Sequence, residues 1–179
     1  MAFKRKREEA HAGEVEKGAP DGAVTSSGPT PPDGPDAMLF DEFGMHQLWY
    51  LERRMKDELA RAARVDSVFS LACWRLKMLP GESMSAELVR KAAALIAGRL
   101  RSYDVYARID EELFAAILFD AEPAAVSTVA FRIKADLQVI GRSTGRWQSG
   151  VSTFPDDGVD GDAMIQVAFH RLEEDAKAA

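Results

Sequence analysis

Two groups of polar residues near the middle of the chain have types and spacing that could support ligand chemistry. The first is the pair Arg101 and Asp104, and the second is the acidic run Asp110–Glu112. A guanidinium group presents a planar fork of donors that can bind a phosphate through two hydrogen bonds. Carboxylate oxygens are the ligands that hard divalent cations prefer. This stretch is therefore the first candidate for function.

A predicted β-hairpin positions both groups. Val105–Ile109 and Leu113–Phe119 are short runs rich in apolar and strand-forming residues, and the acidic run forms the turn between them. A helix is predicted upstream, from an N-cap at Ser85 to about Ser102. Arg101 and Asp104 then lie where this helix ends and the first strand begins.

The remaining elements are read from hydrophobic periodicity and from turn residues. We predict a helix over residues 43–64, a buried strand over residues 69–76, a helix opening at Glu122–Pro123, a strand over residues 147–154 and a last helix from about Asp160. Helices alternating with strands, together with one hairpin, are typical of an α/β fold with a central mixed sheet flanked by helices.

The first part of the chain differs sharply in composition. Five of the eight prolines and five of the thirteen glycines fall within the first 36 residues, with hardly any large apolar side chain. Such a segment cannot bury enough surface to offset the entropy of ordering. We therefore predict a disordered tail over residues 1–37 and one folded domain over residues 38–179. The basic cluster Lys4–Arg7 is followed at once by glutamates, which favours a solvated tail.

Composition excludes several classes of function. The formal net charge of −6 argues against a chain-wide nucleic-acid surface. Cys73 is the single cysteine and lies in an apolar run, which favours packing and a reducing cytoplasm. No apolar segment approaches the ~20 residues that span a bilayer, and no signal peptide is evident. No Cys/His spacing suggests zinc.

In its folded part the chain resembles the GGDEF family, the diguanylate cyclase domain that makes cyclic di-GMP. Family members carry a helix ending in L-R-x-x-D, a strand ending in R-x, the GGDEF turn and then an apolar strand. Leu100–Asp104, Arg108–Ile109 and Asp110–Phe114 occur here in that order and at those spacings. Gly44–Leu51 and Thr153–Gly158 resemble two further family segments, so that the resemblance covers roughly residues 43–176.

The same resemblance implies that catalysis has been lost at the hairpin. The GGDEF turn uses two glycines so that its backbone can approach the nucleotide closely. Here the turn reads Asp110-Glu111-Glu112-Leu113-Phe114, which has no glycine and carries carboxylates that would repel a triphosphate. Glu112 keeps an acid at the third motif position, whereas Leu113 replaces the next one.

The first strand departs from the family in the same direction. The resemblance places Arg75, Leu76 and Lys77 where the family has D-x-D, whose first aspartate helps to hold the catalytic cation. Basic side chains at that position disfavour a metal by charge. We therefore expect no cyclase activity, no metal and no cofactor. Arg75 and Lys77 could instead cradle a phosphate, although a charged strand end that faces solvent is the simpler interpretation.

A different family site is retained. In the family, R-x-x-D placed five residues before the GGDEF turn is an inhibitory site that binds cyclic di-GMP. Arg101 and Asp104 match it in type and spacing, and Arg132 stands where the next helix often adds an arginine. Arginine can bind phosphate or the Hoogsteen edge of guanine, and aspartate can accept from guanine N1–H and N2–H. The predicted site is thus Arg101, Asp104 and Arg132.

A purely structural interpretation of this pair stays open. Arg101 and Asp104 could form only a surface ion pair, and an arginine in a last helical turn complements the helix dipole without a ligand. Two functions follow. One is an inactive GGDEF-like receptor that binds cyclic di-GMP and signals to an unidentified protein or to a second copy in a homodimer. The other is a ligand-independent interaction scaffold recruited through residues 43–64, for example through Trp49 or Tyr50.

Overall fold

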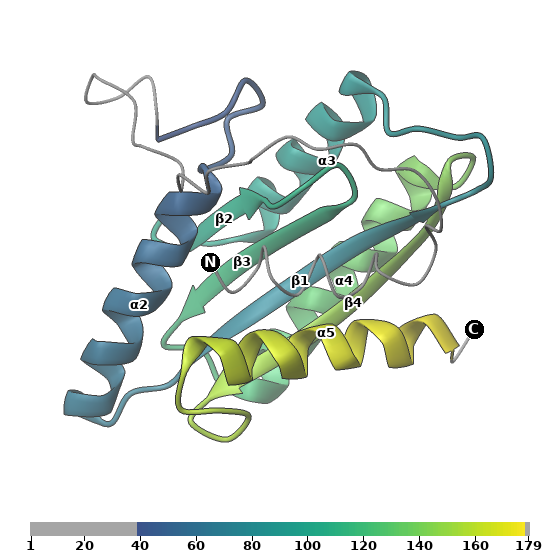
Figure 1. Cartoon of the computed structure of the whole chain (residues 1–179). Coiled ribbons are helices and arrows are strands. Elements are labelled where there is room, and N and C mark those ends of the chain that lie inside the picture. The colour runs from purple at the N-terminus through teal and green to yellow at the C-terminus, as the bar shows by residue number, and fades with distance from the viewer. Residues whose placement is uncertain (1–38, 178–179) are drawn as a thin grey trace, which may run out of the picture.

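The computed structural model describes residues 39–177, which form one α/β domain (Figure 1). The predicted tail lies outside these residues. Elements follow in the order α2 Leu48–Val65, β1 Phe69–Met78, α3 Ala86–Arg99, β2 Val105–Arg108, β3 Leu113–Phe119, α4 Pro123–Gly141, β4 Gly145–Phe154 and α5 Gly161–Lys177. The predicted order of helices and strands is confirmed. No helix in the described part is long and apolar enough to cross a membrane.

The four strands form one sheet in the order β2-β3-β1-β4. All three strand pairs are antiparallel, so the expectation of a mixed sheet was wrong in this respect. The chain path explains this, because β1 lies between β3 and β4 and both of these strands run antiparallel to it. A parallel contact exists only as an isolated bridge between His46 and Ala107, among the residues described.

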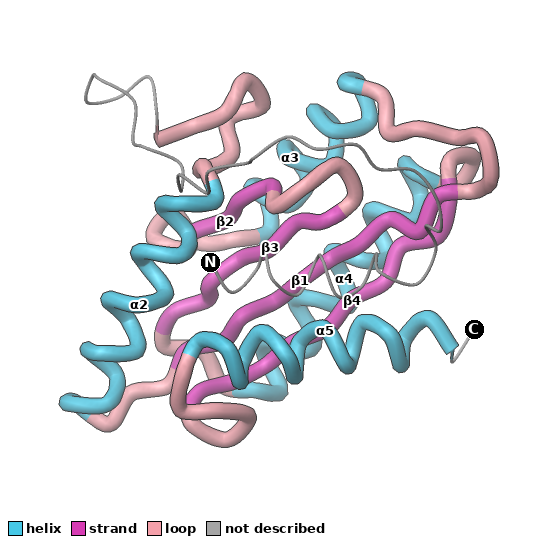
Figure 2. Tube along the Cα trace, viewed as in Figure 1, coloured by secondary structure: helices cyan, strands magenta, loops and turns pink. Residues whose placement is uncertain are grey.

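Two helical layers cover the two faces of the sheet (Figure 2). Helices α2 and α5 pack on one face and α3 and α4 on the other, each over its own apolar cluster. Cys73 is fully buried in the first cluster, which supports its predicted packing role. Burial raises the pKa of its thiol to about 12, so it is held as a neutral thiol.

Strand β1 is the centre of the domain, and polar side chains near it find partners. The indole N–H of Trp74 donates to the backbone carbonyl of Ala130 on α4 at 3.0 Å. The hydroxyls of Ser70 and Thr153 share a hydrogen bond of 2.8 Å between β1 and β4. Buried polar groups that are paired in this way avoid the cost of desolvation and fix the register of the sheet.

The boundaries of several elements differ from those predicted. The first helix begins at Leu48 rather than at residue 43, because Asp41 organises a preceding turn. One carboxylate oxygen of Asp41 accepts the backbone N–H groups of Phe43 and Met45, each at 2.9 Å. Met45 is fully buried, so this turn is anchored in the core. His46, expected in a helix, lies in the bridge to β2 instead.

The residues that begin α3, α4 and α5 agree better with the sequence prediction than the start of α2 does. The Ser85 hydroxyl accepts the backbone N–H of Leu88 at 3.2 Å, as expected of an N-cap. Pro123 occupies the first turn of α4, as predicted. The Asp160 carboxylate accepts the backbone N–H of Ala163 at 2.8 Å and so supports the start of α5.

Candidate functional site

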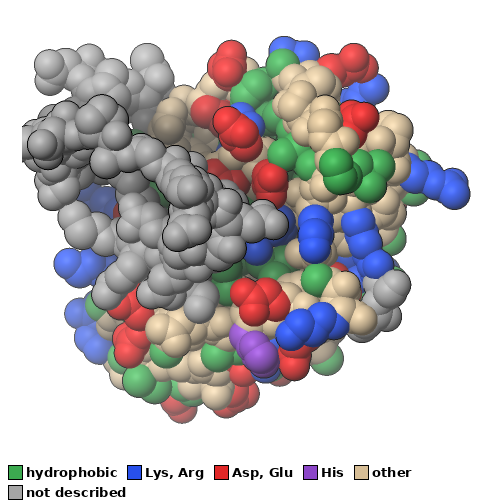
Figure 3. Space-filling model, turned by 45° about the vertical axis from the view of Figure 1, so that its right-hand side comes forward, with side chains coloured by type: hydrophobic (Ala, Val, Ile, Leu, Met, Phe, Trp, Pro, Cys, Tyr) green, Lys and Arg blue, Asp and Glu red, His purple; other side chains and the backbone are tan. Residues whose placement is uncertain are grey.

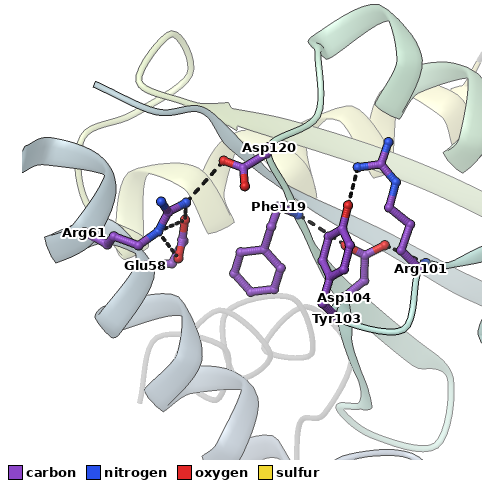
Figure 4. Close-up of polar contacts among 7 residues, drawn as sticks. All are labelled: Glu58, Arg61, Arg101, Tyr103, Asp104, Phe119 and Asp120. Atoms are coloured by element: carbon purple, nitrogen blue, oxygen red, sulfur yellow. Dashed lines mark hydrogen bonds and ion pairs between the residues drawn. The ribbon is translucent and has the colours of Figure 1, made fainter. Parts of the chain in front are cut away.

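The turn from Arg101 to Asp104 joins α3 to β2 and is held together by the Asp104 carboxylate (Figure 4). One oxygen accepts the backbone N–H of Arg101 at 2.8 Å, and the other accepts the backbone N–H of Phe119 at 3.3 Å. The backbone also closes the turn, since the Asp104 N–H donates to the Arg101 carbonyl at 3.0 Å. Asp104 therefore fixes the turn and ties it to the end of β3.

Asp104 is a buried residue, at 6% relative exposure. Burial raises the pKa of its carboxyl, while the backbone hydrogen bonds from Arg101 and Phe119 and the charge of Arg101 act in the opposite direction. The sequence placed this carboxylate in a ligand site. In the structure this carboxylate positions the backbone of the turn through its two hydrogen bonds.

Arg101 behaves differently, because its side chain lies on the surface. Its guanidinium Nη1 donates to the phenolic oxygen of Tyr103 at 2.8 Å, and its Cζ lies 5.8 Å from the centre of that ring. Tyr103 is 53% exposed. The turn thus presents a cation and an aromatic ring to solvent side by side, and the sequence prediction had not included Tyr103. Its only sequence signal is its position inside the R-x-x-D segment.

A small cavity of about 60 Å³ adjoins this turn. Arg101, Asp104 and Arg99 line it together with apolar residues of β3 and α4, among them Phe119 and Val129. Arg99 is already engaged, since its Nη2 donates to Asp136 at 2.6 Å. The structure thus brings Arg101 and Asp104 together at one cavity.

Arg132 is not among the residues that line this cavity. It is exposed on α4, three residues after Val129 and four before Asp136. Residues at these spacings share one face of a helix. Arg132 therefore lies on the face of α4 that borders the cavity, without a contact to Arg101 or Asp104.

The end of β3 connects this turn to α2. Asp120, next to Phe119, accepts from Arg61 Nη2 at 3.2 Å, and Arg61 also pairs with Glu58 at 2.5 Å (Figure 4). Glu58 is buried at 5% relative exposure. Residues 119–120 are therefore held from two sides. Asp104 of the turn bonds the Phe119 backbone, and Arg61 of α2 bonds the Asp120 side chain.

The hairpin turn is closed by its own residues. The Asp110 carboxylate accepts the backbone N–H groups of Glu112 at 2.8 Å and Leu113 at 2.9 Å. Arg108 Nε donates to the Asp110 carbonyl at 2.9 Å. No residue of the turn has a positive φ, since Asp66 and Asp120 are the non-glycine residues with that geometry in the described chain. The turn therefore folds without glycine.

Comparison with solved structures places this arrangement among known domains. The chain superimposes on the GGDEF domain of DgcB from Caulobacter crescentus in complex with c-di-GMP, with a TM-score of 0.69, 16% identity and coverage of 82% of this chain and 94% of that one. For the FimX GGDEF domain from Pseudomonas aeruginosa, the TM-score is 0.68 at 17% identity, with 79% and 95% covered. This chain has the GGDEF fold.

A third GGDEF structure agrees with this result. A sensory box/GGDEF family protein from Caulobacter crescentus matches with a TM-score of 0.62 at 16% identity, covering 79% of this chain and 99% of that chain. In contrast, no protein-family model matches the sequence, and no curated protein matches it either. The resemblance that the motifs suggested is thus confirmed as a resemblance of fold.

Within the GGDEF fold, two of the positions that depart from the motifs lie next to each other. Arg75 of β1 is the direct cross-strand partner of Leu113 of β3. Leu113 is fully buried, and the Arg75 guanidinium lies 5.1 Å from the ring centre of Phe169 on α5. Lys77 is exposed at the end of β1. An arginine that contacts an aromatic ring and a buried leucine therefore occupy these two neighbouring positions, and neither side chain supplies an oxygen ligand for a hard cation.

Among residues 39–177, no cluster of three or more His, Cys, Asp or Glu side chains could hold a metal ion. On the face shown in Figure 3, acidic and basic side chains are interspersed rather than gathered by sign. The exposed guanidinium of Arg101 beside Tyr103 is consequently the most specific polar feature of the predicted site.

Proposed function

We propose that this domain is a catalytically inactive GGDEF-like receptor that binds cyclic di-GMP at the turn from Arg101 to Asp104. One observation carries the proposal. The turn is fixed by a buried carboxylate, while the side chain of Arg101 is exposed and Arg101 is one of the residues that line the adjoining cavity. A cation on a rigid turn loses little entropy when it binds an anion.

The chemistry of the exposed groups fits this ligand. Arg101 can hold a phosphate or the Hoogsteen edge of guanine in two hydrogen bonds. The exposed ring of Tyr103 offers a surface on which a base can stack. Arg132, on the face of α4 that borders the cavity, supplies a second cation for the phosphates. Asp104 acts mainly by holding the turn, and its oxygens retain lone pairs that can accept from guanine.

Loss of catalysis is proposed from the residues at the hairpin and on β1. The condensation of two nucleoside triphosphates needs a cation to align and neutralise their phosphates. Arg75 and Leu113 replace a carboxylate pair with a positive and an apolar side chain, and Glu111 adds negative charge at the exposed turn. These residues favour neither a metal nor a triphosphate. We accordingly expect no turnover of GTP with magnesium.

Isothermal titration calorimetry of the full chain with cyclic di-GMP tests binding. Wild type should bind with micromolar or tighter affinity, and Arg101→Ala should lose most of it because the exposed cation is removed without disturbing the turn. Arg132→Ala should weaken binding less. Arg53→Ala is the matched control, since Arg53 is an exposed arginine on α2 that pairs with Asp57 on the same helix.

Absence of heat from wild type at up to about a millimolar ligand would exclude the receptor function. The ligand-independent scaffold would then be the remaining hypothesis. Its proposed anchor is less open than expected, since Tyr50 is half-buried and stacks on His46 with ring centres 4.7 Å apart. Turnover of GTP would separately refute the inactive assignment.

A further inference from the structure

Strand β4 is an edge of the sheet. It pairs with β1 over its whole length, from Gly145 to Phe154, and no strand lies on its other side in the described part of the chain. An edge strand of this length normally presents unpaired N–H and C=O groups that can template pairing with another chain. The outer side of β4 would therefore be open to pairing with a second chain if its backbone groups had no other partners.

The first half of this outer edge is occupied by one side chain of α4. The amide nitrogen of Gln138 donates to the Gly145 carbonyl at 3.2 Å, and its amide oxygen accepts the backbone N–H of Trp147 at 2.8 Å. A single glutamine thus pairs with a carbonyl and an N–H two residues apart, as a neighbouring strand would.

The middle of the edge is occupied from α5. Asp175 accepts the backbone N–H of Ser149 at 2.9 Å through one carboxylate oxygen. Lys134 of α4 pairs with the same carboxylate, with Nζ at 2.8 and 3.0 Å from its two oxygens. Both side chains of this ion pair are mostly buried, at 19% and 24% exposure. The pair therefore holds Asp175 against the strand.

The last part of the edge is occupied by a second ion pair. Arg171 Nη1 donates to the Val151 carbonyl and to Asp157, both at 2.6 Å. The Asp157 carboxylate accepts the backbone N–H of Thr153 at 2.9 Å, and its own N–H donates to the Thr153 carbonyl at 2.8 Å. These contacts continue the same alternation along the strand.

We propose that Gln138, Asp157, Arg171 and Asp175 form an edge cover that prevents β4 from pairing with a second copy of this chain. Their partners are backbone N–H or C=O groups of the alternate residues from Gly145 to Thr153, on the side of β4 that does not pair with β1. Charged side chains and covering groups are the means by which natural sheets protect their edges. The edge cover supplies hydrogen bonds that a second strand would otherwise supply.

A cavity of about 550 Å³ lies along this edge between α4 and α5, and it could instead be taken for a ligand site. Its two cations, Lys134 and Arg171, are each neutralised by a carboxylate, and the Ser149 N–H and the Val151 carbonyl at its base are already bonded. Little is left to recognise an anion or an extended peptide. The arrangement therefore favours protection of the edge over binding in the cavity.

Sedimentation velocity of the full chain, with amide hydrogen exchange on the same samples, tests the edge cover. Asp157→Ala combined with Asp175→Ala should give a higher association state than wild type at equal concentration. In that assembly the Ser149 and Thr153 amides should be protected again, now by a second strand. Glu87→Gln is the control, because it removes an exposed pair with Lys91 on α3, away from the edge.

A single substitution covers the case in which the double variant does not fold. Gln138→Ala should speed exchange of the Trp147 amide about tenfold, as expected from loss of one hydrogen bond, and should increase association. Folded variants that keep the association state of wild type overturn the proposal. So does a wild-type assembly in which β4 already pairs with its counterpart.

Discussion

Among single residues, Arg101 and Asp104 have separate tasks although they form one motif. The Arg101 side chain is exposed, and Asp104 holds the turn through the backbone N–H of Arg101 rather than through that side chain. Asp104 is buried and bonded to two backbone N–H groups. Substitutions at these two positions therefore measure different properties, and only Arg101→Ala reports cleanly on a ligand.

The Asp104 role predicts a loss of stability without any ligand. Asp104→Ala should lower the free energy of unfolding by about 1–3 kcal/mol, because the N–H groups of Arg101 and Phe119 lose their acceptor. Urea unfolding monitored by tryptophan fluorescence measures the change. A stability equal to that of wild type would show that the carboxylate does not hold the turn.

The lowered pKa of Asp157 predicts that the stability of the domain falls at acidic pH. Burial acts to raise the pKa of this carboxyl, but hydrogen bonds from Arg171 and from the Thr153 amide outweigh it and lower the pKa below its usual 3.8. The unfolded chain then binds more protons than the folded one in this range. The stabilisation by the Asp157 carboxylate is fully present above its unfolded-state pKa. It is lost as the pH falls through its lower folded-state pKa.

Urea unfolding at a series of pH values checks this dependence. The difference in stability between wild type and Asp157→Asn should be constant near neutrality and should shrink below about pH 4. Asp66→Asn serves as a control at an aspartate with no ion pair to Arg171. A difference that grows on acidification would contradict the lowered pKa.

Among the elements, α5 and β4 are in unusually close contact at Gly150. A methyl group added there would lie 2.0 Å from the Ala168 carbonyl oxygen and 2.8 Å from the Leu172 nitrogen, both backbone atoms of α5. Neither atom can move without shifting the helix. A glycine at this position therefore sets the distance between helix and strand.

A pair of glycine substitutions tests this contact. Gly150→Ala should destabilise the domain by about 1–3 kcal/mol through overpacking. Gly98→Ala in α3, where nothing lies within 4 Å of the added methyl group, should instead stabilise it by roughly 0.5 kcal/mol through helix propensity. Thermal unfolding of the two variants shows whether each substitution raises or lowers the stability of the domain. Equal effects at the two positions would refute the close packing.

The elements also show what the sequence could and could not predict. The N-cap at Ser85, the proline at the start of α4 and the hairpin strands follow from local chemistry, and all were found. The start of α2 was missed because Asp41 and the buried Met45 determine it through a turn. Strand β4 begins two residues earlier than predicted, at Gly145, whose pairing with Met78 comes from the sheet and not from its own propensity.

For the whole molecule, ordered motifs predicted the fold where no family model matches the sequence. Spacing was enough to predict the GGDEF fold, because short polar motifs mark the ends of particular strands and helices. Spacing could not show that Asp104 is buried, since one of its partners, the Phe119 N–H, comes from a strand fifteen residues away. Nor could it show that Arg132 does not line the cavity that Arg101 and Asp104 share.

The most direct test of the receptor function is a map of backbone amide chemical shifts during titration of the full chain with cyclic di-GMP. The proposal predicts shifts at residues 99–105, at residues 118–120 and on the bordering face of α4, with none at the hairpin turn of residues 110–113. Saturable shifts confined to residues 99–105, residues 118–120 and that face of α4 would support a ligand site at the Arg101 turn. Shifts centred on the hairpin turn, or no shifts at all, would contradict it.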